Sequence, residues 1–138
     1  MSEVFINVNA LLRYLLNDVP EQADQIESLL GEAERGEVRL VTHAHIIAEL
    51  VWVLASFYKV SRQQVRQQVE AIIHTPGLEV DERTLVLSAL RDYDEKNVAY
   101  IDAYTAAWMA ARGMSEIATF DKHFKRYSNL ALRLISQK

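Results

Sequence analysis

Three acidic residues stand in stretches of sequence that are otherwise free of charge. Glu49 is the only charged residue in 42–57, and Asp102 is the only one in 97–111. Asp121 directly follows the short run IATF. A carboxylate on an apolar helix is costly to bury unless it is paired, hydrogen-bonded or bound to a cation. We therefore expect these acids, and Glu49 in particular, to have a partner.

Each acid also has an ordinary structural interpretation. Glu49 can extend its carboxylate to solvent from the surface of its helix. Asp102 can occupy the first turn of a helix, where the macrodipole favours negative charge. Asp121 can cap a helix or close a turn. Each signal is weak alone, and the combination carries more weight.

The acids fall within a chain of short strands that alternate with longer helices. Apolar spacing and helix breakers predict helices over 10–16, 20–35, 43–58, 62–74, 82–96 and 100–112. Strand-forming runs predict strands over 4–8, 38–41, 78–80, 117–120 and 132–135. The expected N-caps of the first, third and fourth helices are Asn9, Thr42 and Ser61.

This alternation predicts a parallel sheet with right-handed crossovers. We expect a single α/β domain over 1–138, with three layers, α/β/α, and a central sheet of four to five short strands. In such sheets, functional groups collect outside the carboxyl ends of the strands. Asn7 follows the strand VFI and Asp121 follows the strand IATF, so both are expected at one edge of the sheet.

The composition excludes several kinds of site. The chain has no cysteine, which removes disulfides, thiolate metal sites and thiol nucleophiles. No secretory signal or long apolar run is present, so we expect a soluble cytoplasmic protein without membrane contact. The net charge of -4 is uneven, because 1–37 holds eight acids and two bases, whereas 112–138 holds six bases and two acids.

Four segments, in this order, resemble the PIN-domain nucleases, especially the VapC-like toxins of bacterial and archaeal toxin-antitoxin pairs. The segments are FINVNALLRYLLND, IIAELVWVLASFY, YIDAYTAAWMAARG and IATFDKHFKR, and together they span nearly the whole chain. The resemblance implies a parallel sheet flanked by helices. It also implies a cluster of acids that binds Mg²⁺ or Mn²⁺ and cleaves RNA phosphodiesters through a metal-activated water.

The resemblance assigns the metal-binding and catalytic roles to Asn7, Glu49, Asp102 and Asp121, and supporting roles to Asn9 and Thr119. The family has an aspartate at the first of these positions, so Asn7 is a departure. An amide oxygen can bind Mg²⁺ but brings no negative charge. We therefore predict a weakened or inactive nuclease. The asparagine is either natural or was introduced to silence a growth-inhibiting ribonuclease, and we favour the second origin.

Basic and apolar residues predict the partners. An RNA backbone could follow the cationic side chains of Arg13, Arg112, Lys122, Lys125 and Arg126, although an ordinary solvated face explains them as well. Leucines of the first helix, with Trp52 and Phe57, give more apolar surface than a small core needs. We expect a homodimer and a cognate antitoxin to cover part of that surface.

Two other classes of function remain open. In the first, Asn7 is native and the chain is a non-catalytic module that binds RNA or a protein. In the second, the acids belong to a different Mg²⁺ enzyme, such as a phosphatase or a flap nuclease. The chain is short for a flap nuclease, and Asn9 stands where a phosphatase would have its second acid.

Overall fold

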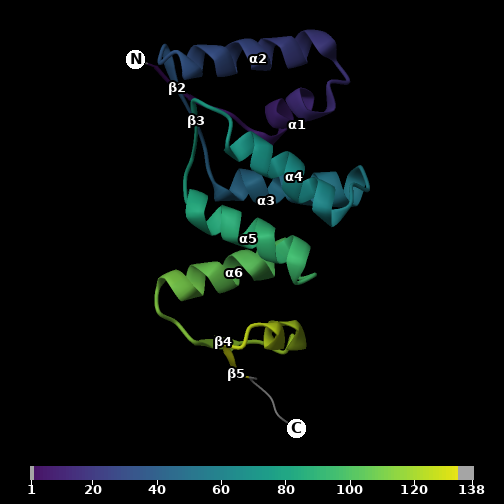
Figure 1. Cartoon of the computed structure of the whole chain (residues 1–138), viewed down its shortest axis with the longest axis vertical. Helices are drawn as coiled ribbons and strands as arrows, with labels where there is room; N and C mark the ends of the chain where they lie inside the picture. The colour runs from purple at the N-terminus through teal and green to yellow at the C-terminus, as the bar shows by residue number, and fades with distance from the viewer. Residues whose placement is uncertain (1, 134–138) are drawn as a thin grey trace.

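The computed structural model describes residues 2–133, in which helices alternate with short parallel strands (Figure 1). The strands are β1 (Ser2–Phe5), β2 (Val38–Thr42), β3 (Leu78–Val80), β4 (Glu116–Ala118) and β5 (Ala131–Arg133). The α-helices are α1 (Val8–Leu16), α2 (Pro20–Glu34), α3 (Ala44–Trp52), α4 (Arg62–Ile73), α5 (Arg83–Glu95) and α6 (Tyr100–Ala111). A π-helical turn, η1 (Val53–Phe57), extends α3, and a 3₁₀ turn, η2 (Lys122–Arg126), separates β4 from β5.

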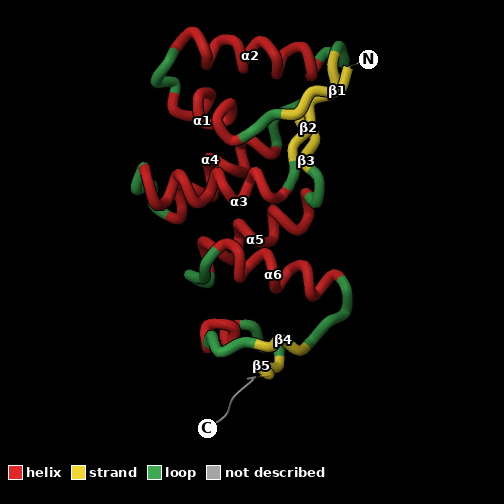
Figure 2. The backbone as a smooth tube through the Cα atoms, turned by 180° about the vertical axis from the view of Figure 1, so that it is seen from behind, coloured by secondary structure: helices red, strands yellow, loops and turns green. Residues whose placement is uncertain are grey.

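The strands form two separate parallel sheets. One has the order β1-β2-β3, and the other pairs β4 with β5. The predicted α/β class with parallel strands is confirmed, but the strands do not form one central sheet. Figures 1 and 2 show β1 and β4 toward opposite ends of the molecule, with helices α3, α5 and α6 between them. The predicted last strand extends to residue 135, and its residues 134 and 135 lie outside the described part of the chain.

The two faces of the three-stranded sheet differ in character. Leu40, Leu78 and Val80 point into the core, where they are almost completely buried. The other face carries Arg39, which pairs with Glu79 at 2.9 Å and also with Glu3, all with half or more of their side-chain surface exposed. The charged side chains of this face are exposed to solvent, so they are stable without a covering layer of helices. The second helical layer expected from the sequence is therefore not required on this face.

Helix α1 begins earlier than its sequence pattern predicts. The side chain of Asn7 accepts a hydrogen bond from the Ala10 backbone N–H at 3.1 Å and caps the helix. Asn9, the expected cap, therefore lies inside the first turn. The expected strand over 4–8 ends at Phe5 for the same reason, since Val8 already belongs to the helix.

The third helix also differs from its prediction at both ends. Thr42 is a buried residue of β2 and does not cap the helix, while His43 occupies the N-cap position without a side-chain hydrogen bond. Past Trp52 the chain widens into η1, where the Tyr58 N–H donates to the Val53 carbonyl five residues back. Ser61, by contrast, caps α4 as predicted and accepts from the Gln64 N–H.

The centre of the core lies among β2 and helices α1, α3, α4 and α5. Its largest fully buried side chains are Leu11, Leu40, Ile47, Leu50, Leu54, Ile73, Leu90, Val65, Val69 and Val86. No helix in 2–133 has both the length and the apolar character needed to cross a bilayer.

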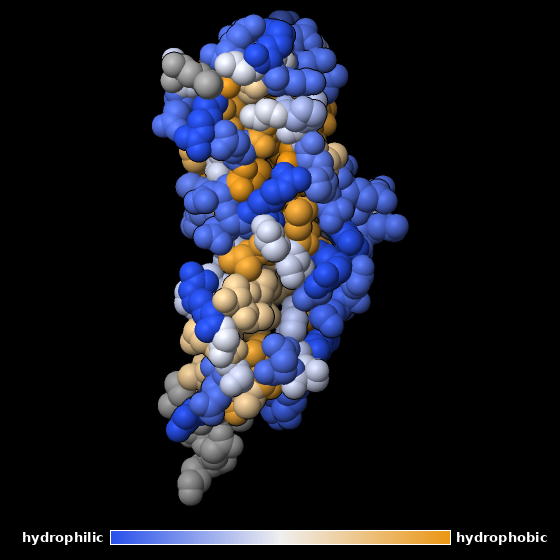
Figure 3. Space-filling view, turned by 60° about the vertical axis from the view of Figure 1, so that its left-hand side comes forward, coloured by the Kyte–Doolittle hydropathy of each residue, from blue (hydrophilic) through white to orange (hydrophobic). Residues whose placement is uncertain are grey.

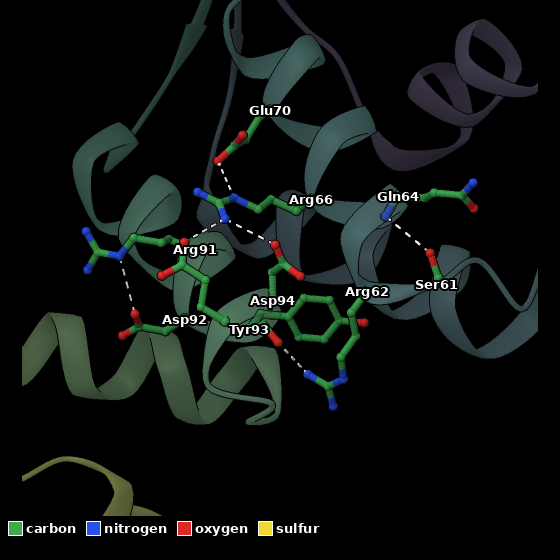
Figure 4. Close-up of polar contacts among 10 residues, drawn as sticks. Ser61, Arg62, Gln64, Arg66, Glu70, Arg91, Asp92, Tyr93 and Asp94 are labelled. Carbon is green, nitrogen blue, oxygen red and sulfur yellow. Dashed lines mark hydrogen bonds and ion pairs between the residues drawn. The ribbon is translucent and has the colours of Figure 1, made fainter.

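Two arginines of α4 fasten it to α5 (Figure 4). Arg66 contacts the carboxylates of Glu70, Asp94 and Glu95 at 3.0–3.1 Å. These hydrogen bonds raise the pKa of the Arg66 guanidinium. Arg62 donates to the Tyr93 carbonyl at 2.7 Å and lies over the Tyr93 ring. The interface between α4 and α5 is thus fixed by directional contacts as well as by apolar packing.

The segment β4-η2-β5, over residues 116–133, is anchored to the far side of α5. The Tyr127 hydroxyl donates to the Asp92 carboxylate at 3.1 Å in a buried position. Arg126 donates to the backbone carbonyls of Lys96 and Asn97, just beyond α5. We call residues 116–133 the C-terminal segment, and its position depends on these contacts.

The contact between Tyr127 and Asp92 predicts a measurable loss of stability. Tyr127→Phe removes the hydroxyl that serves a buried carboxylate, so the free energy of unfolding should fall by about 1–2 kcal/mol. Tyr58→Phe, at an exposed ring, is the matched control and should change it by less than about 0.5 kcal/mol. Urea unfolding measures both variants. Equal midpoints for the two variants would contradict the anchoring role of Tyr127.

Candidate active site

Two of the predicted acids, Asp102 and Asp121, lie close enough to influence each other. Asp102 is in the first turn of α6, and Asp121 follows β4. Partial burial raises the pKa of the Asp102 carboxyl, and the negative charge of Asp121 raises it further. The structure thus places two carboxylates that are 19 positions apart in the sequence within electrostatic range of each other.

The carboxylate of Asp121 is held by a tight turn. Its Oδ1 accepts from the His123 backbone N–H at 2.8 Å, which caps η2. The Asp121 N–H donates to the Thr119 hydroxyl at 2.9 Å. Thr119, predicted as a supporting residue, therefore fixes the backbone at the acid. The capping role that was the ordinary interpretation of Asp121 is also present.

His123 is a neighbour of this pair that the sequence interpretation placed simply on the surface. Its side chain is exposed, but its Nδ1 lies 3.3 Å from Oδ1 of Asp121. When the imidazole is protonated, its charge lowers the pKa of Asp102. The signal that could have identified it is the Asp-x-His spacing in a short turn, where the side chain two residues on folds back toward the acid.

The other two predicted metal ligands lie elsewhere in this arrangement. Glu49 is exposed on α3, which agrees with its ordinary interpretation as a solvated acid. Asn7 is exposed at the end of β1, where its Oδ1 caps α1. Within residues 2–133, no group of three or more histidine or acidic side chains is placed to hold a metal ion. The four positions do not form one cluster because β1 and β4 belong to different sheets.

The residues present fit part of a metal site. Mg²⁺ in proteins is commonly held by one or two carboxylates, with water and phosphate completing its shell. Asp102 and Asp121 supply two such carboxylates, and their mutual repulsion is the kind that a cation relieves. Asn9 is exposed in the first turn of α1, near Asn7 and remote from this pair.

The predicted RNA-binding residues do not all lie beside Asp121, and some of them are engaged in other contacts. Lys122 and Lys125 are exposed on η2, directly after Asp121. Arg126 is committed to the carbonyls that anchor the C-terminal segment. The Arg112 guanidinium stacks on the Trp108 ring at 3.8 Å. Arg13, on α1, pairs with Asp18 just beyond the end of that helix at 3.0 Å. It does not lie beside Asp121.

The interaction between the two carboxylates predicts a shift in titration. Asp121→Asn should lower the pKa of Asp102 because it removes the neighbouring negative charge, while the effect of burial stays. A group whose pKa is raised in the folded state contributes its stability below the unfolded pKa and loses it as pH rises through the folded pKa. The variant should therefore lose less stability over that interval. NMR titration of the carboxyl carbons measures the pKa.

Glu116→Gln is the control for this titration, because it removes the same charge from β4 without touching the pair. An Asp102 pKa that responds equally to both substitutions would show that the two carboxylates do not interact directly.

Comparison with known proteins finds a matching family model and a similar ribonuclease. The sequence profile of the PIN domain matches residues 4–130. A VapC ribonuclease from Aquifex aeolicus (strain VF5) is 23% identical over 121 residues, which cover 88% of this chain and 89% of the relative. The PIN-domain match includes all four positions assigned to the acidic site. With nearly its whole length matched, the chain belongs to the PIN-domain family.

Proposed function

We propose that the protein is a divalent-metal-dependent endoribonuclease and the toxin of a toxin-antitoxin pair. The observation that carries the proposal is the meeting of Asp102 and Asp121 inside a PIN-domain match over 4–130. The similarity to a VapC ribonuclease supports RNA as the substrate. The whole chain, 1–138, acts as one domain in this proposal.

The chain's own residues would divide the work as follows. Asp102 and Asp121 would hold Mg²⁺ or Mn²⁺. Glu49 and position 7 are assigned to the same set of oxygen ligands by the resemblance alone, because the described residues do not bring them to this pair. A divalent ion bound there would supply an activated water and would offset charge on the phosphate. The His123 N–H orients the Asp121 carboxylate, and the Thr119 hydroxyl fixes the Asp121 backbone, through the hydrogen bonds described above. The resemblance gives Asn9, in the first turn of α1, a supporting role beside position 7.

Asn7 sets the level of activity in this proposal. Its Oδ1 is occupied by the cap of α1, and the side chain brings no charge to a cation. The protein with Asn7 is therefore a weak or inactive nuclease. The same hydrogen bond favours a second candidate function, a non-catalytic PIN-domain module that binds RNA or protein, because a capping amide has a structural role without any metal.

Restoring an acid at this position tests the proposal. Asn7→Asp should raise Mg²⁺- or Mn²⁺-dependent RNA cleavage by about tenfold or more, equivalent to about 1.4 kcal/mol. The reason is the added negative charge at the metal. Aspartate caps helices as well as asparagine does, so the fold should be unaffected. Cleavage of labelled RNA with and without chelator measures the effect.

Asn129→Asp is the control for added charge, since Asn129 is exposed near β5. Single-stranded DNA and a small phosphoester should be tried beside RNA. An Asn7→Asp protein that binds RNA but cleaves none of these substrates with any divalent ion would favour the binding module. Cleavage of the small phosphoester alone would favour a phosphatase.

The basic turn beside Asp121 should bind the RNA backbone. Reversing both charges, Lys122→Glu with Lys125→Glu, should weaken RNA binding and reduce the slope of log affinity against log salt by about 1.4, because about two phosphate contacts are lost. Lys59→Glu, at an exposed position remote from this turn, should change neither. Fluorescence anisotropy across a salt series measures the slope. Unchanged binding would mean that the two lysines form an ordinary solvated face.

The apolar surface is the expected site of the protein partners. Trp52, Phe57 and Ile101 each expose more than half of their surface, and Trp108 exposes 38%. In the face shown in Figure 3, hydrophobic side chains reach the surface in a band that runs along the middle of the molecule, with hydrophilic side chains on both sides. A cognate antitoxin would cover such a band, because exposed apolar patches of this kind commonly mark protein interfaces.

A further inference from the structure

A cavity of about 420 Å³ opens on the charged face of the three-stranded sheet. We call it the sheet pocket, and its lining includes Phe5, Arg39, Val41, His43, Glu79 and Asp81. Phe5 is in register with Val41, and Val41 with Glu79, so these three side chains share one face of the sheet. Cavities that hold small ligands commonly measure about 300–1,000 Å³. The sheet pocket therefore has the size of a ligand site.

The position of the sheet pocket also suits a ligand. Phe5 is the last residue of β1, while His43 and Asp81 directly follow β2 and β3. Ligands of open parallel sheets bind at the carboxyl ends of the strands. The backbone fixes this end of the pocket, because the Asp81 N–H donates to the Thr42 carbonyl at 3.0 Å.

Two aromatic rings form one part of the pocket lining. The ring centroids of Phe5 and His43 are 5.1 Å apart, and the rings are tilted by 53°. Phe5 exposes 48% of its surface. His43 is also exposed, and its side chain makes no capping hydrogen bond to α3. Phenylalanine and histidine rings exposed in this way are surfaces on which unpaired bases stack.

Arg39 and Asp81 add hydrogen-bonding groups of opposite sign. Arg39 has five N–H donors, and three of them are used, by Glu79 at 2.9 and 3.0 Å and by Glu3. Among the described residues, the Asp81 carboxylate has neither a hydrogen bond nor an ion pair, and its side chain is exposed. The sheet pocket therefore offers free donors on Arg39 and free acceptors on Asp81.

We propose that the sheet pocket binds an unpaired guanine base of RNA. Guanine stacks on the rings of Phe5 and His43. Its N1–H and 2-amino groups are adjacent donors that match the two oxygens of the Asp81 carboxylate. Its O6 and N7 atoms are acceptors that match arginine donors. Adenine, cytosine and uracil each lack the adjacent pair of donors, so the pocket selects guanine.

The guanidinium of a protein partner is the other planar group with parallel donors. Arg39 disfavours it, because a second positive charge in the same pocket would be repelled. A guanidinium also has no acceptor for the remaining Arg39 donors. A neutral base that carries both donors and acceptors fits the sheet pocket better.

The sheet pocket lies near positions assigned to the candidate active site. Phe5 is two residues before Asn7 in the sequence. Burial raises the pKa of Tyr104 on α6, and neighbouring acids that include Asp81 raise it further. Tyr104 is two residues after Asp102. A role in choosing the cleaved bond rests on the proposed nuclease function, and there the pocket sets a preference for RNA with a guanine near that bond.

Binding of free nucleosides tests the pocket without metal or cleavage. In NMR titrations, guanosine should bind about tenfold more tightly than inosine, which lacks the 2-amino group, and than adenosine or uridine. It should shift the amide signals of the pocket residues. Equal affinity for all four nucleosides would overturn the proposal. Tighter binding of N-acetylarginine amide than of guanosine would also overturn it, in favour of a protein partner.

Two variants with matched controls locate the binding. Asp81→Asn should weaken guanosine binding by about tenfold and leave adenosine binding nearly unchanged. Asp24→Asn removes the same charge from an exposed position on α2 and should change neither. Phe5→Leu should weaken both nucleosides by about fivefold, because stacking does not depend on the base. Phe57→Leu, at an exposed ring on η1, is its control. Equal effects of variant and control would overturn the proposal.

Cleavage by the Asn7→Asp protein separates the pocket from the proposed function. RNAs that differ only in one unpaired base should be cleaved about tenfold faster with guanine there, and Asp81→Asn should remove that preference. Cleavage without any preference for guanine would overturn the role of the pocket and leave the nuclease function standing. Guanosine binding by a protein that cleaves no RNA would support the pocket and count against the nuclease function.

Discussion

The contact between the C-terminal segment and α5 determines where the chemistry of this protein can lie. Tyr127 donates to Asp92 in a buried position, and Arg126 reaches the carbonyls after α5. These bonds fix the turn that carries Asp121 where its charge acts on Asp102 in the first turn of α6. The same bonds keep β4 away from β1. One set of interactions therefore places two of the four candidate site positions within electrostatic range of each other and keeps them apart from the other two.

Ionising Asp102 beside Asp121 is energetically unfavourable in this fold, and the described contacts only partly offset that cost. Burial and the charge of Asp121 both disfavour ionised Asp102, while a protonated His123 only partly offsets them. Charged pairs elsewhere are resolved by arginine, as at Arg66 with its three carboxylates. No arginine performs that function among the described contacts of Asp102 and Asp121. A retained repulsion of this kind is typical of sites that bind a cation.

The sequence predicted the elements well where a single periodic signal governs them. The positions of α2, α4, β3 and α5 follow from apolar spacing, caps and breakers, and Ser61 caps its helix as expected. The start of α1 was missed because two asparagines, Asn7 and Asn9, are equally good caps by type. The split of the sheet could not be predicted, because it depends on Tyr127 and Arg126 contacting residues about 30 positions away. The acids of the candidate site remain a prediction from the sequence, which could not tell which of them would lie within electrostatic range of each other.

Position 7 shows how a structural role and a chemical role can coincide in one side chain. The cap of α1 needs an oxygen that accepts from the Ala10 N–H, and asparagine and aspartate both supply it. Either residue therefore caps the helix, and an acid there would also be stabilised by the positive end of the macrodipole. Binding of a cation would differ between the two residues, since only the acid adds a negative charge. Because asparagine and aspartate can both cap α1, the choice between them at position 7 bears on the charge at this position and not on the cap.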